Sequence, residues 1–133
     1  MDTDRIDRFR EQWQYSASGE ELPDQDQLID AEEMLLIRIP RPMRAFLLWL
    51  SDLQPVGWEL VTCHDPFLHS YLPEVTALAW DEELPRYLIP LAFNASSYAA
   101  VDDSAAVHIW SKQLKEAVDQ FDSIESWIET GWQ

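Results

Sequence analysis

The sequence predicts an α+β domain in which a mostly antiparallel sheet is covered by helices from both ends of the chain. Three observations predict this class: helical spacing of apolar residues in the first half, strand-like runs separated by short loops in the last third, and a closing amphipathic segment. The 133 residues include seven tryptophans, and no linker divides them. We therefore expect one domain over residues 1–133.

Three helices are expected in the first half, because apolar residues recur three or four positions apart. They span 3–15, 25–39 and 43–50. The second ends in a continuous apolar run, 34–37, so a strand at its end is the alternative. The polar stretch 16–24 between the first two helices is predicted to be an exposed, mobile loop.

The middle of the chain predicts one strand between two helices that open with proline. Pro42 suits the first turn of the helix at 43–50, because a helix does not need that N–H. A central strand is expected at 58–63. Pro73 favours a further helix within 66–80.

The last third predicts a three-strand antiparallel meander. The runs 87–93, 98–101 and 106–110 are strand-like, and loops as short as 94–97 and 102–105 join antiparallel neighbours.

Two local features refine this picture of the last third. Pro90 cannot donate a ladder hydrogen bond, so its strand should lie at an edge or be bulged there. The final helix is expected to begin at Asp122, with Glu125 completing a capping box and Ile124 and Trp127 on one face.

Charge narrows the classes of partner. Twenty-five Asp and Glu against nine Lys and Arg give a formal charge of −16, which opposes nucleic-acid binding and favours a basic partner. The single cysteine, Cys63, excludes an intramolecular disulfide, and no apolar run is long enough to span a bilayer. The first residues lack the features of a secretory signal, so a cytoplasmic, membrane-free protein is expected.

The sequence does not predict catalytic chemistry. Cys63, His64 and Asp65 are consecutive, but adjacent residues on an extended chain point apart, so a buried thiol is the simpler interpretation. The histidines His64, His69 and His108 lack the spacing that supplies two metal ligands from one element. We expect no catalytic residues, cofactor or metal. A deep pocket lined by His64, Asp65 and His108 would revive the enzyme alternative.

Acidic clusters are the candidate binding residues. Most carboxylate pairs in so acidic a chain are expected to be solvated surface. Asp81, Glu82 and Glu83 precede the meander, and Asp102 and Asp103 lie in its second turn. The two groups are predicted to form a single acidic patch that attracts a basic protein.

The tryptophans divide into two predicted groups. Trp49, Trp58 and Trp127 are expected in the core, whereas Trp110 and Trp132 are candidates for exposed anchors because polar or terminal segments flank them.

In the strand 106–110, His108 and Trp110 share one face, and Val107 and Ile109 share the other. If the branched pair faces the core, His108 and Trp110 face outward, and an outward Trp beside acids is what an interface hot spot would look like. A helix covering Trp110 is the alternative.

The order of these parts resembles the SUKH superfamily, the Smi1/Knr4-like domains. Members show a proline-led early helix, a mid-chain Trp, a strand, a short turn, a strand ending in acid, an aromatic-tipped strand and a closing helix. The stretches that carry the resemblance are Ile39-Pro40-Arg41-Pro42-Met43-Arg44-Ala45-Phe46-Leu47-Leu48, Trp80, 87–93, 98–102, 107–110 and Phe121-Asp122-Ser123-Ile124-Glu125-Ser126-Trp127-Ile128.

The resemblance implies a non-enzymatic bacterial immunity protein that binds and neutralises a cognate toxin, commonly a nuclease or deaminase. Such a protein acts as a monomer or weak homodimer in the cytoplasm. The predicted toxin-binding residues are Asp81, Glu82, Glu83, Asp102, Asp103, His108 and Trp110. Two alternatives remain open: a regulatory scaffold like the fungal relatives, and a DNA-mimic protein that binds a host nucleic-acid-binding protein.

Overall fold

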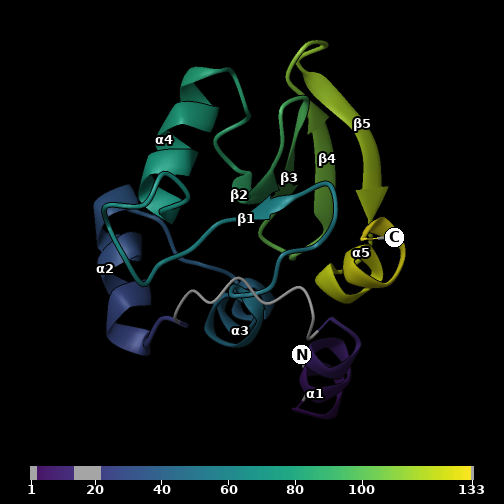
Figure 1. Ribbon diagram of the computed structural model, residues 1–133. Helices are drawn as coiled ribbons and strands as arrows, with labels where there is room; N and C mark the ends of the chain where they lie inside the picture. Colours follow the sequence, from purple (N-terminus) through teal and green to yellow (C-terminus); the bar gives the residue numbers. More distant parts are fainter. Residues whose placement is uncertain (1–2, 14–21, 133) are drawn as a thin grey trace.

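The computed structural model describes residues 3–13 and 22–132, and it is an α+β fold built on one five-stranded antiparallel sheet. Figure 1 shows α4 on one side of the strands, with α3 and α5 close together below them and both chain ends nearby. The predicted fold class is therefore confirmed. The helices are α1 (Thr3–Gln12), α2 (Gln25–Leu35), α3 (Arg41–Leu50), α4 (Leu72–Asp81) and α5 (Ile124–Gly131).

The sheet follows chain order, β1-β2-β3-β4-β5, with every neighbour antiparallel. The strands are β1 (Glu59–Leu60), β2 (Ile89–Phe93), β3 (Ser97–Val101), β4 (Val107–Ser111) and β5 (Glu116–Phe121). The predicted meander is present as β2, β3 and β4. The register shifts between Pro90 and Ala92, so the predicted irregularity at the proline is confirmed.

Two strand expectations need correction. The strand expected at 58–63 shortens to β1, which lies at an edge of the sheet and is followed by a parallel bridge between Thr62 and Tyr71. β5 was not predicted. Its first five residues are all exposed, whichever face of the sheet they lie on. The sequence therefore lacks the alternation of apolar and polar residues that marks a half-buried strand.

Helix ends follow local hydrogen bonding. Asp24 caps α2, because its side chain accepts from the Gln27 N–H while the Gln27 side chain accepts from the Asp24 N–H. α5 is capped by Ser123, not by Asp122 as predicted: the Ser123 hydroxyl accepts from the Ser126 N–H at 3.1 Å, and Glu125 pairs with Arg5 instead.

The predicted first and second helices are also shorter than expected. α1 ends at Gln12, and the expected loop lies for the most part outside the described residues, as do residues 14 and 15 of the expected helix. α2 ends at Leu35 with no strand after it, because Leu36 adopts the left-handed conformation (φ 55°) and its N–H bonds to the Glu32 carbonyl.

An aromatic cluster joins the helices below the sheet. Its edge-to-face or tilted ring pairs have centroids 5.5 to 6.3 Å apart, and its members are Trp13, Phe46, Trp58, Trp127 and Trp132. A Cβ at Gly131 would lie 2.7 Å from the Trp127 ring, so this close approach requires glycine. The cluster binds α1, α3 and α5 to the start of β1.

Two arginines hold α1 over this cluster. Arg10 forms a two-pronged ion pair with Asp52, at 2.6 and 2.9 Å, and donates to the Trp49 carbonyl. Arg5 reaches Glu125 and Glu129 of α5. The N-terminal helix is therefore fixed by charge as well as by packing.

Candidate interaction surface

Register determines which side chains of the sheet face α4. Tyr98 pairs with Trp110 and Ala100 pairs with His108, so these four lie on one face. Tyr98 contacts α4 through a hydrogen bond of 3.1 Å to Glu82, which directly follows the helix. Trp110 is thus covered on the α4 side of the sheet.

The prediction that Trp110 is an exposed anchor is wrong. Its side chain is only 2% exposed, packed beside Tyr98 with ring centroids 6.2 Å apart, and Lys115 lies over its indole. The alternation of the strand was assigned correctly, but both of its faces are covered: Val107 is buried and Ile109 is half-buried.

Two other tryptophans are reversed relative to expectation. Trp132 is 1% exposed within the aromatic cluster, whereas Trp49 is 51% exposed near the end of α3. The prediction for Trp49 is wrong because position 49 lies outside the buried face of α3. That face consists of Met43, Phe46, Leu47 and Leu50. Trp127 is in the core as predicted, and Trp58 is half-buried.

Asp102 and His108 form a structural pair at one end of β3. Their side chains are 2.9 Å apart and mostly buried. Burial alone would raise the pKa of Asp102, but hydrogen bonds from His108, Ser104 and the Ala106 N–H outweigh it and lower that pKa to about 2. Asp102 organises the β3–β4 turn.

The predicted acidic patch divides into two separate groups. Glu82 touches Tyr98 near the start of β3, whereas Asp102 follows its end, and β3 spans roughly 13 Å between them. Asp81 and Glu83 lie with Glu82, and both are exposed. Asp103 is also exposed, at the other end of the sheet. A single contiguous patch is therefore not formed.

The group after α4 belongs to a larger surface that sequence reasoning missed. Glu74, Ala77, Leu78 and Asp81 are the exposed positions of α4, spaced three, four and seven apart along one side of the helix. Leu78 is 56% exposed, which is unusual for a large apolar residue between two acids.

Phe67 lies at the N-terminal end of this helix side and is 96% exposed. A tight turn fixes it, because the Asp65 carboxylate accepts from the Phe67 N–H at 2.9 Å and the Leu68 N–H bonds to the Asp65 carbonyl. An aromatic ring on an ordered turn is a low-entropy anchor for a partner. We call Phe67, Glu74, Leu78, Asp81 and Glu83 the α4 face.

A groove of about 770 Å³ runs beneath Phe67 and Leu78, with Phe93 and Tyr98 in its lining. Lys112 closes it by lying 4.5 Å from the centre of the Tyr98 ring and donating to the Asn94 carbonyl. Burial, followed by the Glu82 carboxylate, raises the pKa of Tyr98, so this phenol remains a protonated donor.

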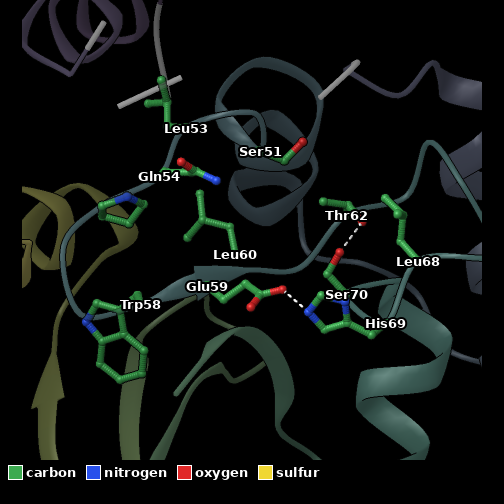
Figure 2. Close-up of a pocket in the computed structure, with 11 residues that line it drawn as sticks. Ser51, Leu53, Gln54, Trp58, Glu59, Leu60, Thr62, Leu68, His69 and Ser70 are labelled. Atoms are coloured by element: carbon green, nitrogen blue, oxygen red, sulfur yellow. Dashed lines mark hydrogen bonds and ion pairs between the residues drawn. The ribbon is translucent and has the colours of Figure 1, made fainter. Parts of the chain in front are cut away.

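A second cleft adjoins the first along the loop before α4. Figure 2 shows Glu59 reaching His69 across it, and Thr62 bonded to Ser70 at 2.9 Å. Leu68 and His69 line both hollows. These contacts tie the Phe67 loop to β1, which keeps the α4 face in a fixed shape.

The residues considered for catalysis do not assemble into a site. Cys63 is buried, and burial raises its pKa to about 12, which disfavours the nucleophilic thiolate. His108 pairs with Asp102 rather than approaching His64 or Asp65. Within residues 3–13 and 22–132, no group of His, Cys, Asp and Glu has the arrangement of a metal site.

The described residues thus define an α+β domain with an exposed face on which apolar and acidic side chains lie together. In the part of the chain that is described, no helix has the length and apolar character needed to cross a membrane.

The chain belongs to the SUKH family: the SUKH_5 family model, described as SMI1-KNR4 cell-wall, matches residues 3–133. A crystal structure of a protein from Pseudomonas syringae pv. tomato is similar to it, with 37% identity, a TM-score of 0.85, and coverage of 95% of this chain and 97% of that one. No curated protein matches the chain.

Proposed function

We propose that this protein is a cytoplasmic immunity protein that binds a cognate bacterial toxin with a basic surface and blocks it without catalysis. The observation that carries the proposal is the combination of SUKH membership over nearly the whole chain with the α4 face, which sets exposed apolar groups among acids. A formal charge of −16 speeds association with a basic protein.

The α4 face has the composition of an interface centre and rim. Phe67 and Leu78 supply apolar area, and Glu74 and Asp81 flank them with no ion-pair partner among the described residues. Carboxylates left free in the unbound protein are available for lysines and arginines of the toxin. Of the residues predicted from sequence, Asp81, Glu82 and Glu83 stay in the proposal, and Trp110 is replaced by Phe67.

Asp102, Asp103 and His108 have a lesser part in this proposal. Asp102 and His108 satisfy one another, so neither is free to pair with a toxin without breaking the turn. Asp103 is exposed but lies at the other end of β3.

The test is to express the protein with the product of the neighbouring gene and to measure survival and complex formation at low and high salt. We expect a complex whose association slows as salt rises, together with restored growth. Phe67→Ala should weaken the complex about 30-fold, the loss of a hot-spot aromatic, whereas Trp49→Ala, an exposed aromatic elsewhere, should leave it unchanged.

Charge variants locate the surface. Glu74→Lys and Asp81→Lys should slow association, and Asp7→Lys, an equal charge change on α1, should slow it less. A complex that tolerates all α4 variants would overturn the α4 face as the binding site while leaving the immunity role intact. Absence of any toxin among the neighbouring gene products would overturn the immunity role and favour the scaffold alternative.

A further inference from the structure

A third hollow, with the opposite charge, lies between the α2–α3 connection and the segment after α4. Its rim carries Arg38, Arg41 and Arg86, and Tyr87 stands beside them. Ile39 and Ile89, only 3% and 7% exposed, form an apolar floor. The space is about 740 Å³. We call these six residues the arginine groove.

The groove gathers three of the nine basic residues of the chain. Three other arginines are neutralised by ion pairs: Arg10 by Asp52, Arg44 by Glu32, and Arg5 by Glu125 of α5. Among the described residues, Arg38 and Arg41 have no ion pair, hydrogen bond or ring contact, and both are exposed.

Arg86 and Asp103, the other charged residues of the lining, do not cancel the positive charge of Arg38 and Arg41. Arg86 lies over the Trp80 ring at 5.2 Å, which orients its guanidinium without neutralising it. Asp103 is the one acid in the lining, and within the described residues it makes no ion pair. In a protein with 25 acids, this hollow therefore carries three arginines against one carboxylate.

Apolar exposure accompanies the charge. Tyr87 is 68% exposed at the rim. The lining continues through Ile37 and Arg38 into a shallower hollow that includes Leu36, which is 91% exposed. Leu36 is also held in the left-handed conformation, a strained state for a branched residue. The occupant must therefore present apolar side chains as well as negative charge.

We propose that the arginine groove binds an acidic peptide segment of a partner protein, one in which Asp or Glu residues flank a leucine or an aromatic residue. The carboxylates would receive charge-assisted hydrogen bonds from Arg38 and Arg41, and the apolar side chain would rest on Ile39, Ile89 and Tyr87. The apolar floor disfavours a nucleic-acid backbone or a free phosphate, which offers no apolar surface. This surface is distinct from the α4 face and does not depend on the toxin.

A selection of displayed random peptides on the purified protein tests the proposal, with the variant Arg38→Glu/Arg41→Glu in solution as competitor. We expect enrichment of peptides in which acids flank Leu, Phe, Tyr or Trp. Neither side chain makes a hydrogen bond, ion pair or ring contact with a described residue, and Glu at position 41 is favourable in the first turn of α3, so the variant should fold.

The enriched peptides are then titrated by fluorescence anisotropy. Affinity should fall roughly tenfold for Arg38→Glu and more for the double variant, and stay within about twofold for Arg8→Glu, an equal charge change on α1. Three outcomes would overturn the proposal. They are enrichment of basic peptides, a loss of peptide affinity in Arg8→Glu as large as that in Arg38→Glu, and displacement of the bound peptide by inorganic phosphate as effectively as by unlabelled peptide. Loss of toxin binding in Arg38→Glu would also overturn it, because the two surfaces would then be one.

Discussion

The two faces of the sheet use aromatic residues in different ways. Below the sheet, Trp127 and Trp132 pack against Phe46 and Trp13 in an apolar cluster. On the α4 side, Tyr98 and Trp110 are equally buried, but Lys112 and Lys115 lie over their rings and Glu82 accepts from the Tyr98 hydroxyl. On the lower face the buried rings contact one another, whereas on the α4 side they contact charged side chains.

This difference separates stability from recognition. A close-packed apolar cluster is sensitive to any change in side-chain volume. The residues of a charged and partly exposed face can instead change to suit a partner. We therefore expect substitutions below the sheet to affect folding, and those on the α4 face to affect binding.

The largest effect is expected for Trp127→Ala. The Trp127 ring is fully buried and contacts three other rings of the cluster, so its removal leaves a cavity and should lower the free energy of unfolding by about 3–5 kcal/mol. Urea unfolding followed by circular dichroism measures the change. Phe67→Ala is the control, with an expected change of less than about 0.5 kcal/mol. Similar losses in both variants would remove the distinction between the two faces.

A smaller effect, dependent on pH, is expected for Asp102→Asn. The pKa of Asp102 falls from 3.8 to about 2 on folding, so the ionised form stabilises the protein above pH 4, and this stabilisation is lost as the pH falls toward 2. The contribution is about 2 kcal/mol at most. Asparagine keeps the acceptor that the turn requires.

Unfolding of wild type and Asp102→Asn should therefore differ at pH 7 and converge near pH 2. In Trp127→Ala, the deficit relative to wild type should stay constant across that range, since no titrating group is lost. A difference for Asp102→Asn that persists at pH 2 would mean that packing, rather than charge, holds the β3–β4 turn.

The sequence predicted most helices and the meander because their signals are local. Helical spacing, a proline in the first turn and short loops depend only on neighbouring residues. β5 was not predicted because it is exposed on both faces, so its apolar and polar residues do not alternate. The capping box of Asp24 and Gln27 is likewise a local signal, and it marks the start of α2.

The candidate site was predicted less well, because exposure is decided by tertiary packing. Strand alternation placed Trp110 with His108, yet nothing local reveals that α4 and the segment after it cover that face. Asp81, Glu82 and Glu83 were found by charge alone. Phe67 has a weak local signal, an Asp two residues earlier that favours a turn, but its exposure follows from where the loop lies.

The smallest effect on stability is expected for Glu83→Gly. This substitution tests the separation of stability from recognition, because it should raise the free energy of unfolding and slow association with the toxin. Glu83 follows α4 with φ 82°, a conformation that glycine adopts without strain, and its side chain is 71% exposed. Replacing it should raise the free energy of unfolding by about 0.5–1 kcal/mol. Among the described residues, its only ion pair is with Lys115, at 3.9 Å. This pair is too long and too exposed to offset the gain in stability.

The same substitution should slow association with a basic toxin by removing one carboxylate from the α4 face. Glu83→Asn is the matched control, because asparagine also tolerates this backbone conformation and lacks the charge. If both variants are more stable and bind more slowly, the carboxylate at this strained position is retained for recognition. If Glu83→Gly lowers stability, the contact with Lys115 is structural, and Glu83 belongs with the buried half of the α4 side rather than with its exposed face.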